Sequence, residues 1–181
     1  IAISLECSFL VDDEAGAGPP AQSPILARPR DHPPGLAVLV EHGQVADSGE
    51  RVVILEDTRE LQCAAPNLVA LRTKDGVATL SDLVRSSLRL RPDRIPIGEV
   101  RGAEALDLLK AWGTGHPGGI GTIHAGTALG ALRRLEQLIQ EAVITVPRAL
   151  IAETINVIAV LAGRGADRRL VELALVRGLG A

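Results

Sequence analysis

The sequence predicts an α/β fold built around a mostly parallel sheet. From Arg51 onward, short apolar runs alternate with segments of helical periodicity, which is the pattern of strands and helices that alternate along a parallel sheet. The 181 residues are 46% apolar, which is enough for one domain with its own core. We therefore expect a sheet with helices on both faces.

Residues 1–50 differ in composition from the rest of the chain. Residues 12–14 are acidic, residues 16–20 are rich in Gly and Pro, and residues 27–34 contain three prolines. Such composition is typical of irregular, poorly ordered chain. Only the run LAVLV at 36–40 could form a short strand or helical turn. We therefore divide the chain into an irregular segment, 1–50, and a folded part, 51–181.

Four apolar runs of the folded part predict strands that alternate with helices. These strands are expected at 52–55, 68–71, 95–97 and 120–124. Pro96 is the weak point of the third strand, because proline has no N–H for a sheet ladder and normally disfavours a central position. The chain is expected to end in a β-hairpin, with strands at 157–161 and 170–176.

Helical periodicity predicts the remaining elements. Helices are expected at 79–90, 103–112, 127–143 and 147–154. The first has Thr79 and Asp82 at the spacing of a capping box. In the third, four apolar residues share one face: Leu132, Leu135, Leu138 and Ile139. Pro147 suits the first turn of the last helix.

Composition and charge exclude several classes of protein. A net charge of −3 gives no basic field, so direct nucleic-acid binding is not expected. Cys7 and Cys63 lie in unrelated contexts without a CxxC spacing, which argues against a zinc site or a disulfide framework and suits a reducing cytosol. No apolar stretch has the length of a membrane span, and the first residues lack the layout of a signal peptide. We expect a soluble protein.

Two strand ends carry polar side chains that are candidates for chemistry. The predicted strand 95–97 runs into Gly98-Glu99, and the strand 120–124 ends at His124. Parallel α/β folds build their ligand crevices at such strand ends, so we expect Glu99 and His124 to converge on one edge. Alone, each has a plainer interpretation: a solvated carboxylate and a satisfied core histidine. His116 lies in a Gly-rich turn and could simply be exposed.

Three stretches carry a resemblance to a known family. They are RVVILEDTREL at 51–61, RPDRIPIGEVRG at 91–102 and GHPGGIGTIHA at 115–125. In order and spacing they resemble the Asp box, Walker B region and His box of type II and type IV secretion ATPases, most closely the TrbB-type conjugal transfer ATPases. The resemblance implies a RecA-like core that uses ATP and Mg²⁺. It also implies a hexameric ring at the cytoplasmic face of the inner membrane, which powers DNA or protein transfer with the secretion or conjugation machinery.

The same resemblance assigns roles to the acidic residues. It makes Glu60 a candidate water-activating carboxylate, while Glu56 and Asp57 would hold the metal and the loop geometry at the cofactor. Glu99 corresponds to the Walker B glutamate, which would orient the attacking water or bind Mg²⁺ indirectly. Asp57 has an equally good interpretation as a cap, because Asp-Thr is a common cap sequence.

The resemblance also makes His124 a sensor of the γ-phosphate. Arg101 is the strongest candidate for a catalytic arginine, since arginine fingers contribute about 10³ to 10⁵ in rate. Arg85 is a second candidate, at the cofactor and the subunit boundary. Two further arginines are weaker candidates for the boundary: Arg91 and Arg94. Any one of these arginines alone could be an ordinary surface residue.

One part of the family pattern is absent from this sequence. The family binds phosphates with a Gly-rich loop that ends in Gly-Lys-Ser/Thr. The only lysines are Lys74 and Lys110, and neither follows a glycine or precedes a hydroxyl residue. Gly118, Gly119 and Gly121 precede no lysine, so we interpret them as residues that shape the backbone.

The missing loop decides what we expect of this chain. The chain begins with Ile1 and contains no methionine, which is typical of a fragment or a processed form. We expect the C-terminal part of a TrbB-like ATPase that would couple ATP hydrolysis to translocation when intact, and at most weak nucleotide binding here. Whether this chain is an enzyme stays open. The alternatives are a catalytically inactive oligomerisation or interaction module, and a gene remnant.

Overall fold

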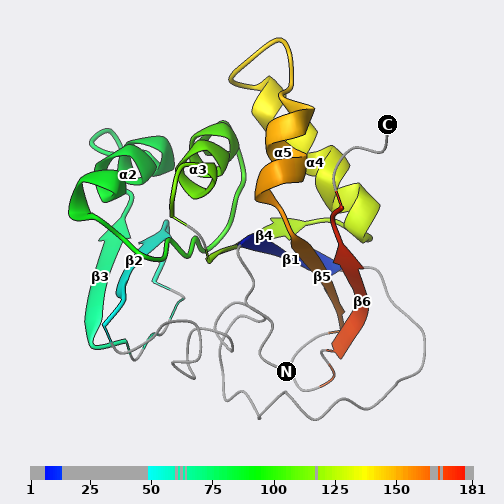
Figure 1. Cartoon of the computed structure of the whole chain (residues 1–181), viewed down its shortest axis with the longest axis horizontal. Helices are drawn as coiled ribbons and strands as arrows, with labels where there is room; N and C mark the ends of the chain where they lie inside the picture. Colours follow the sequence, from blue (N-terminus) through cyan, green and yellow to red (C-terminus); the bar gives the residue numbers. More distant parts are fainter. Residues whose placement is uncertain are drawn as a thin grey trace.

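The computed structural model describes residues 7–13, 49–59, 61, 63, 65–116, 118–163, 167 and 169–177. Its strands form two sets (Figure 1). One set has the order β4-β1-β5-β6, in which only β6 is antiparallel to its neighbour. The other is the parallel pair β2-β3. The bounds are β1 Cys7–Asp13, β2 Arg51–Glu56, β3 Asn67–Arg72, β4 Gly119–His124, β5 Val157–Ala162 and β6 Arg169–Leu175.

The segment 94–97 joins the two sets of strands. It forms isolated parallel bridges to β2 on one side and to β4 on the other. The N–H of Leu55 donates to the carbonyl of Pro96 at 2.9 Å, and the N–H of Ile97 donates to Ile120 at 2.8 Å. The strand predicted at 95–97 therefore lies centrally but makes bridges instead of a regular ladder, because Pro96 has no N–H to donate.

Strand β1 is an element that sequence analysis missed. It lies between β4 and β5 and runs parallel to both, although residues 1–50 were expected to be mostly irregular. The run 36–40 lies outside the described residues, and the division of the chain at residue 50 stays a prediction. The C-terminal hairpin is confirmed, since β5 pairs antiparallel with β6, with a register shift between Val160 and Leu161.

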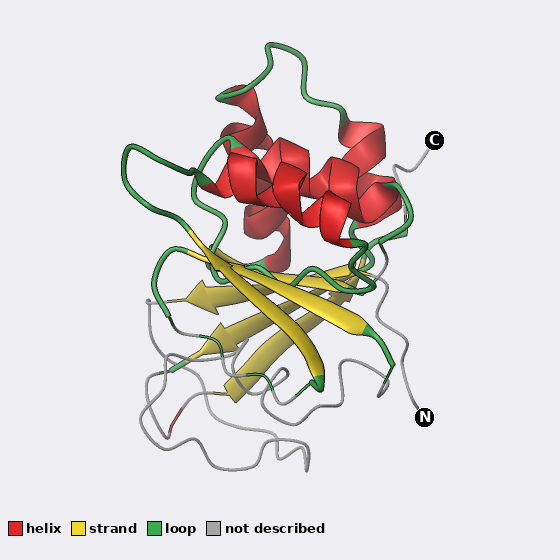
Figure 2. Ribbon diagram, turned by 90° about the vertical axis from the view of Figure 1, so that its left-hand side faces the viewer, coloured by secondary structure: helices red, strands yellow, loops and turns green. Residues whose placement is uncertain are grey.

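The described helices lie together on one face of the sheet (Figure 2). They are α2 Leu80–Ser87, the 3-10 turn η1 Leu88–Leu90, α3 Glu104–Gly113, α4 Ala128–Gln140 and α5 Arg148–Thr154. Each of the α-helices α2, α3, α4 and α5 begins one residue after its predicted start. The mixed α/β class is confirmed, whereas helices on the opposite face are not among the described residues.

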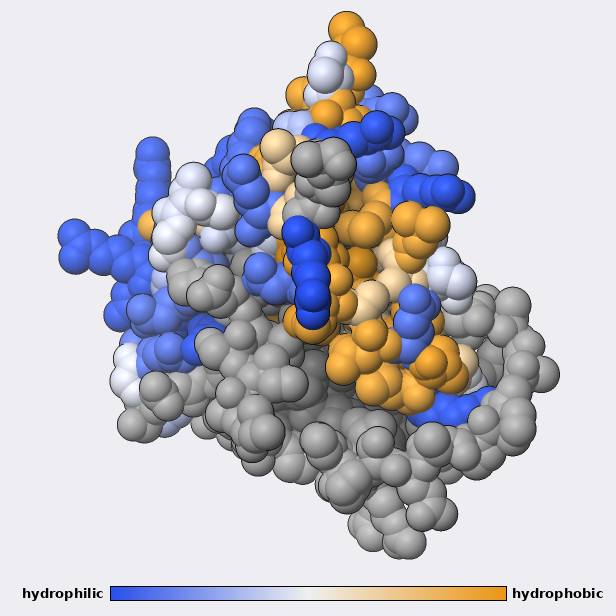
Figure 3. Space-filling view, turned by 45° about the vertical axis from the view of Figure 1, so that its right-hand side comes forward, coloured by the Kyte–Doolittle hydropathy of each residue, from blue (hydrophilic) through white to orange (hydrophobic). Residues whose placement is uncertain are grey.

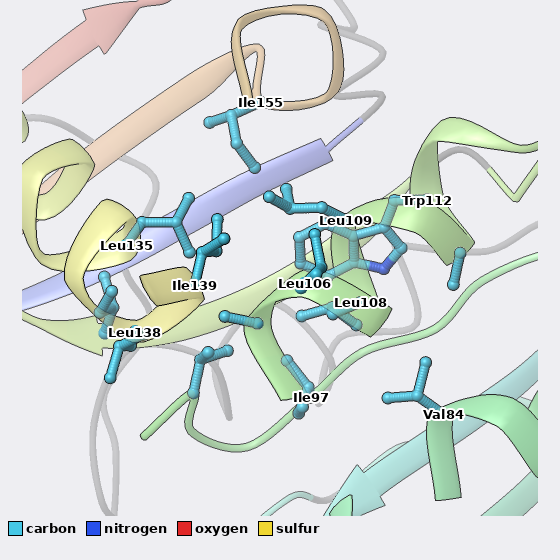
Figure 4. Close-up of a cluster of buried hydrophobic side chains, with 14 of the residues drawn as sticks. Val84, Ile97, Leu106, Leu108, Leu109, Trp112, Leu135, Leu138, Ile139 and Ile155 are labelled. Carbon is cyan, nitrogen blue, oxygen red and sulfur yellow. The ribbon is translucent and has the colours of Figure 1, made fainter. Parts of the chain in front are cut away.

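The main core lies between these helices and the sheet (Figure 4). Its fully buried side chains include Leu108 and Leu109 of α3 and Leu138 and Ile139 of α4. Trp112 of α3 is also buried, and its indole N–H donates to the carbonyl of Ile95 at 3.1 Å. The core therefore ties α3 directly to the segment that joins the two sets of strands.

The end of the four-stranded sheet formed by β6 exposes apolar side chains. Figure 3 shows them on the side of the molecule formed by β6 and α4. They are Leu170, Val171, Leu173 and Leu175 of β6 and Leu129 of α4. Strand β6 is the edge of its sheet.

Among the residues that the structure describes, none of the helices combines the length and the hydropathy that a membrane span requires.

The predicted capping box at the start of α2 is confirmed. The hydroxyl of Thr79 accepts the N–H of Asp82 at 3.2 Å, and the Asp82 carboxylate accepts the N–H of Thr79 at 3.0 Å. The Thr79 N–H, and then its hydroxyl, hold the pKa of the Asp82 carboxyl below its ordinary value. A lowered pKa means that the carboxylate stabilises the fold above its unfolded pKa and loses this effect as pH falls through the folded value.

Thr79→Ala should therefore lower the free energy of unfolding by about 1 kcal/mol at pH 7. The loss should be smaller at an acidic pH below the lowered pKa of Asp82, where protonation of its carboxylate has already weakened the cap. Urea unfolding at both pH values measures this difference. Ser86→Ala, on the exposed face of the same helix, should change stability little, and an equal loss in both variants would show that the cap is not the cause.

Candidate functional site

Glu99 follows the joining segment and is held between the two sets of strands. On one side, the N–H of Gly98 donates to Leu55 of β2 at 2.9 Å. On the other, the N–H of Val100 donates to Thr122 of β4 at 2.9 Å, and the Thr122 hydroxyl donates to the carbonyl of Gly98. These bonds fix the backbone on both sides of Glu99, so the direction of its Cα–Cβ bond is defined.

The carboxylate of Glu99 contacts two cationic or polar side chains. His124, the last residue of β4, places Nε2 3.1 Å from Oε1 of Glu99. The guanidinium of Arg101 pairs with the other oxygen, Oε2. The Glu99 side chain is 19% exposed, against 57% for His124 and 60% for Arg101. The structure thus brings Glu99 and His124 together at one sheet edge, as the two strand ends predict, and adds Arg101.

An open pocket of about 390 Å³ adjoins this cluster. Its lining includes Asp57 after β2, Lys74 and Thr79 before α2, and Arg101 and Glu104 at the start of α3. Asp57 and Arg101 therefore face a common space. Glu104 is a residue that sequence analysis did not single out; its signal was an acid in the first turn of a predicted helix, just after the Walker B-like motif.

Glu56 is buried and has partners of its own. Its carboxylate, 3% exposed, accepts the N–H of Leu61 at 3.1 Å and lies 3.4 Å from Nε of Arg72. A buried acid with these partners anchors the loop that leaves β2 to the neighbouring strand β3. The expected role of Glu56 in holding the metal and the loop geometry at the cofactor stays a prediction. Glu60 lies outside the described residues, so its role as a water-activating carboxylate stays a prediction.

The candidate arginines other than Arg101 lie elsewhere in the fold. Arg85 of α2 pairs with Asp107 of α3 at 3.0 Å, which joins the two helices at the surface. Arg94 pairs with Glu50 at 2.8 Å. Arg91 is exposed and adopts a left-handed backbone conformation with φ of 51°. Contacts of these arginines with a cofactor or a second subunit stay predictions.

The Gly-rich turn before β4 has a structural role in the described residues. His116 lies 3.2 Å from the carbonyl of Ala111 through Nδ1, so it folds back on the end of α3. Gly118 has a φ of +79°, and a side chain on it would collide with Arg94. A side chain on Gly119 would collide with the indole of Trp112. These contacts confirm that Gly118 and Gly119 shape the backbone.

The described residues contain no preformed set of metal ligands. Among them, no three His, Cys, Asp or Glu side chains are grouped as metal ligands. Glu99 already contacts Arg101 and His124, and Glu56 contacts Leu61 and Arg72. An indirect role of Glu99 toward Mg²⁺ stays a prediction.

Several known proteins are similar to this chain in sequence. A family model described as type II/IV secretion system protein matches residues 37–168. The conjugal transfer protein TrbB of Rhizobium radiobacter is 53% identical over 129 residues, which are 71% of this chain and 40% of that protein. The probable TrbB of Sinorhizobium fredii is 51% identical and covers 76% of this chain and 42% of its own length. The chain thus spans about two fifths of these relatives.

Solved structures are similar over nearly the whole chain. The VirB11 ATPase of the Brucella suis type IV secretion system superposes with a TM-score of 0.72 at 23% identity, covering 94% of this chain and 50% of that one. The pilus retraction motor PilT gives 0.61 at 21% identity, covering 94% and 47%. At such identities the likeness concerns the fold alone, and it confirms the RecA-like α/β class.

Proposed function

This chain belongs to the type II/IV secretion system protein family, and on that basis we propose that it is part of an ATPase that drives conjugal transfer or type IV secretion. The observation that carries the proposal is the cluster of Glu99, Arg101 and His124 at adjoining strand ends, where parallel α/β sheets bind ligands. The TrbB relatives at 51% and 53% identity support the conjugal assignment.

The cluster has the groups that hydrolysis of a phosphoanhydride needs. Catalysis of phosphoryl transfer rests on positioning the nucleophile and stabilising charge on the transferred group. Glu99 would orient the attacking water, and Arg101 and His124 would meet the negative charge of the transferred phosphoryl group. Glu99 contacts both of these side chains in the structure, one at each carboxylate oxygen, and each oxygen keeps a further acceptor site for a water.

This chain alone would bind nucleotide at most weakly. It has no Gly-Lys-Ser/Thr sequence, so it lacks the backbone donors and the lysine with which the family holds phosphates. Each hydrogen bond to a charged group contributes about 1.5–3 kcal/mol, and several are lost together. In the proposed assembly the chain would act within a longer protein or beside intact subunits, in a hexameric ring at the cytoplasmic face of the inner membrane.

A chimera tests the catalytic assignment. Residues 51–177 would be joined to the upstream part of the Rhizobium radiobacter TrbB, which precedes the matching region. We expect this chimera to hydrolyse ATP in the presence of Mg²⁺, and Glu99→Gln to lower kcat by about 100-fold, the lower range for loss of a general base. Steady-state release of phosphate measures both rates.

Glu153→Gln serves as the matched control. Glu153 is an exposed acid of α5, so its replacement makes the same change in charge away from the cluster and should leave kcat unchanged. A chimera that hydrolyses ATP equally well with Glu99→Gln would remove Glu99 from the mechanism. Calorimetry on the unmodified chain should detect no ATP binding, and micromolar binding there would reveal a different phosphate site.

The missing phosphate loop favours one alternative, a noncatalytic module that joins a ring of intact subunits. Coexpression with the full-length TrbB relative separates the possibilities. Co-purification of tagged chain with that protein, together with a lower ATPase rate per subunit, would support the module. A chain that never co-purifies would point to a gene remnant or to a part that functions only within its own longer protein.

A further inference from the structure

A buried carboxylate holds the turn that follows Glu99. One oxygen of Glu104, Oε1, accepts the N–H of Arg101 at 2.7 Å and the N–H of Gly102 at 2.8 Å. Glu104 is only 9% exposed. Hydrogen bonds to a charged acceptor in a buried position are among the strong ones. The backbone of the residue that contacts Glu99 is therefore fixed by a side chain three residues further along.

These two bonds hold the turn that leads into the helix that Glu104 begins. Helix α3 has no side-chain cap at Ala103. Its first N–H groups, of Ala105 and Leu106, donate to the carbonyls of Gly102 and Ala103 at 3.1 and 3.2 Å. The Glu104 carboxylate instead binds N–H groups that precede the helix. At the start of α2 the Asp82 carboxylate likewise accepts an N–H from three residues back, that of Thr79, whereas Glu104 accepts the N–H groups of both Arg101 and Gly102.

The turn is also shaped to admit this carboxylate. A Cβ atom on Gly102 would lie 3.1 Å from Oε2 of Glu104 and 3.3 Å from Oε2 of Glu141. Both distances are tighter than usual for a Cβ, so a side chain at this position would press on the carboxylate. Glycine lets Glu104 reach back over the turn, and Glu104 and Arg101 then both line the pocket beside Asp57.

We propose that Glu104 is a positioning residue for the Glu99–Arg101 pair: by fixing the N–H groups of Arg101 and Gly102, it aims the Arg101 guanidinium at Glu99. This inference deepens the proposed function and rests on it for its meaning in catalysis. The geometry itself needs no nucleotide. Glu104 acts through the backbone, so it is not itself a catalytic residue.

Two variants separate the acceptor from the rest of the side chain. Glu104→Gln keeps an oxygen that can accept both N–H groups, whereas Glu104→Ala removes it. Glu153→Ala is the control for loss of an exposed acid in a helix. Two NMR readouts are taken on this chain and its variants, without the TrbB part of the chimera. They are hydrogen exchange of the Arg101 and Gly102 amides, and the side-chain Nε–H resonance of Arg101. Glu99→Gln is the reference for a broken pair.

In Glu104→Ala we expect exchange of the two amides to accelerate by at least about tenfold. The Arg101 Nε–H resonance should move to the position seen in Glu99→Gln. Glu104→Gln should keep the resonance and most of the protection, and Glu153→Ala should change neither. If the alanine variant does not fold, Glu104→Asp replaces it, because the shorter side chain withdraws the acceptor from the two N–H groups.

An unchanged Arg101 resonance in a variant that has lost amide protection would overturn the proposal, because Glu104 would then stabilise the turn without positioning the arginine. Failure of Glu104→Gln to preserve the resonance would overturn it as well. Since neither readout involves ATP, these outcomes are independent of the chimera. An inactive chimera beside a shifted resonance would leave the positioning role standing and reject the ATPase assignment.

Discussion

Replacing Gly119 with alanine should destabilise the protein by about 3 kcal/mol or more, because the site cannot accommodate a methyl group without rearrangement. A Cβ on Gly119 would lie 2.0 Å from Nε1 and 2.1 Å from Cε2 of Trp112. The indole is 3% exposed and donates to Ile95 at 3.1 Å, so it cannot swing into solvent. Either β4 shifts, or the indole moves and loses its hydrogen bond in the core.

Urea unfolding followed by circular dichroism measures this loss. Gly49→Ala is the control, because a Cβ there meets nothing within 4 Å. Adding Trp112→Leu removes the aromatic ring from the collision, so Gly119→Ala should be less harmful in that background than in the native one. Equal losses in both backgrounds would show that the indole is not the obstacle. A shift of β4 would also move His124, its last residue.

The fold could be predicted where local pattern decides it. Apolar runs marked β2 and β3, and the spacing of Thr79 and Asp82 marked the start of α2. Strand β1 escaped because its place between β4 and β5 depends on partners more than a hundred residues away in the chain. Pro96 shows the same limit: its lack of an N–H argues against a central strand, yet its carbonyl still accepts from Leu55.

The candidate site, like the fold, could be predicted from the sequence only in part. Glu99 and His124 could be expected to meet, because parallel strands bring their carboxyl ends to one edge. The pairing of Arg101 with Glu99 depends on a turn whose shape is set by Gly102 and Glu104, and no periodicity reports a turn of this kind. Tertiary packing also supplied Arg85 with a partner in a neighbouring helix, which the sequence around it does not indicate.

Glu56→Ala is expected to lower the free energy of unfolding by about 3 kcal/mol, because it leaves a buried N–H unsatisfied and opens a small cavity. The N–H of Leu61, which is 9% exposed, donates to Glu56 at 3.1 Å. Without that acceptor, the loop after β2 loses its anchor beside Asp57. Urea unfolding measures the stability, and hydrogen exchange of the Leu61 amide reports the anchor itself.

Glu56→Gln separates the hydrogen bond from the charge. The amide oxygen of glutamine can still accept from Leu61, so this variant keeps that hydrogen bond and loses the ion pair with Arg72, whose side chain is 48% exposed. Partly exposed pairs contribute about 1 kcal/mol or less, so Glu56→Gln should retain most of the stability that Glu56→Ala loses. Equal losses would mean that the charge and not the acceptor holds the loop. If Glu56→Ala instead keeps native stability, Glu56 has no structural role and remains a candidate for cofactor binding.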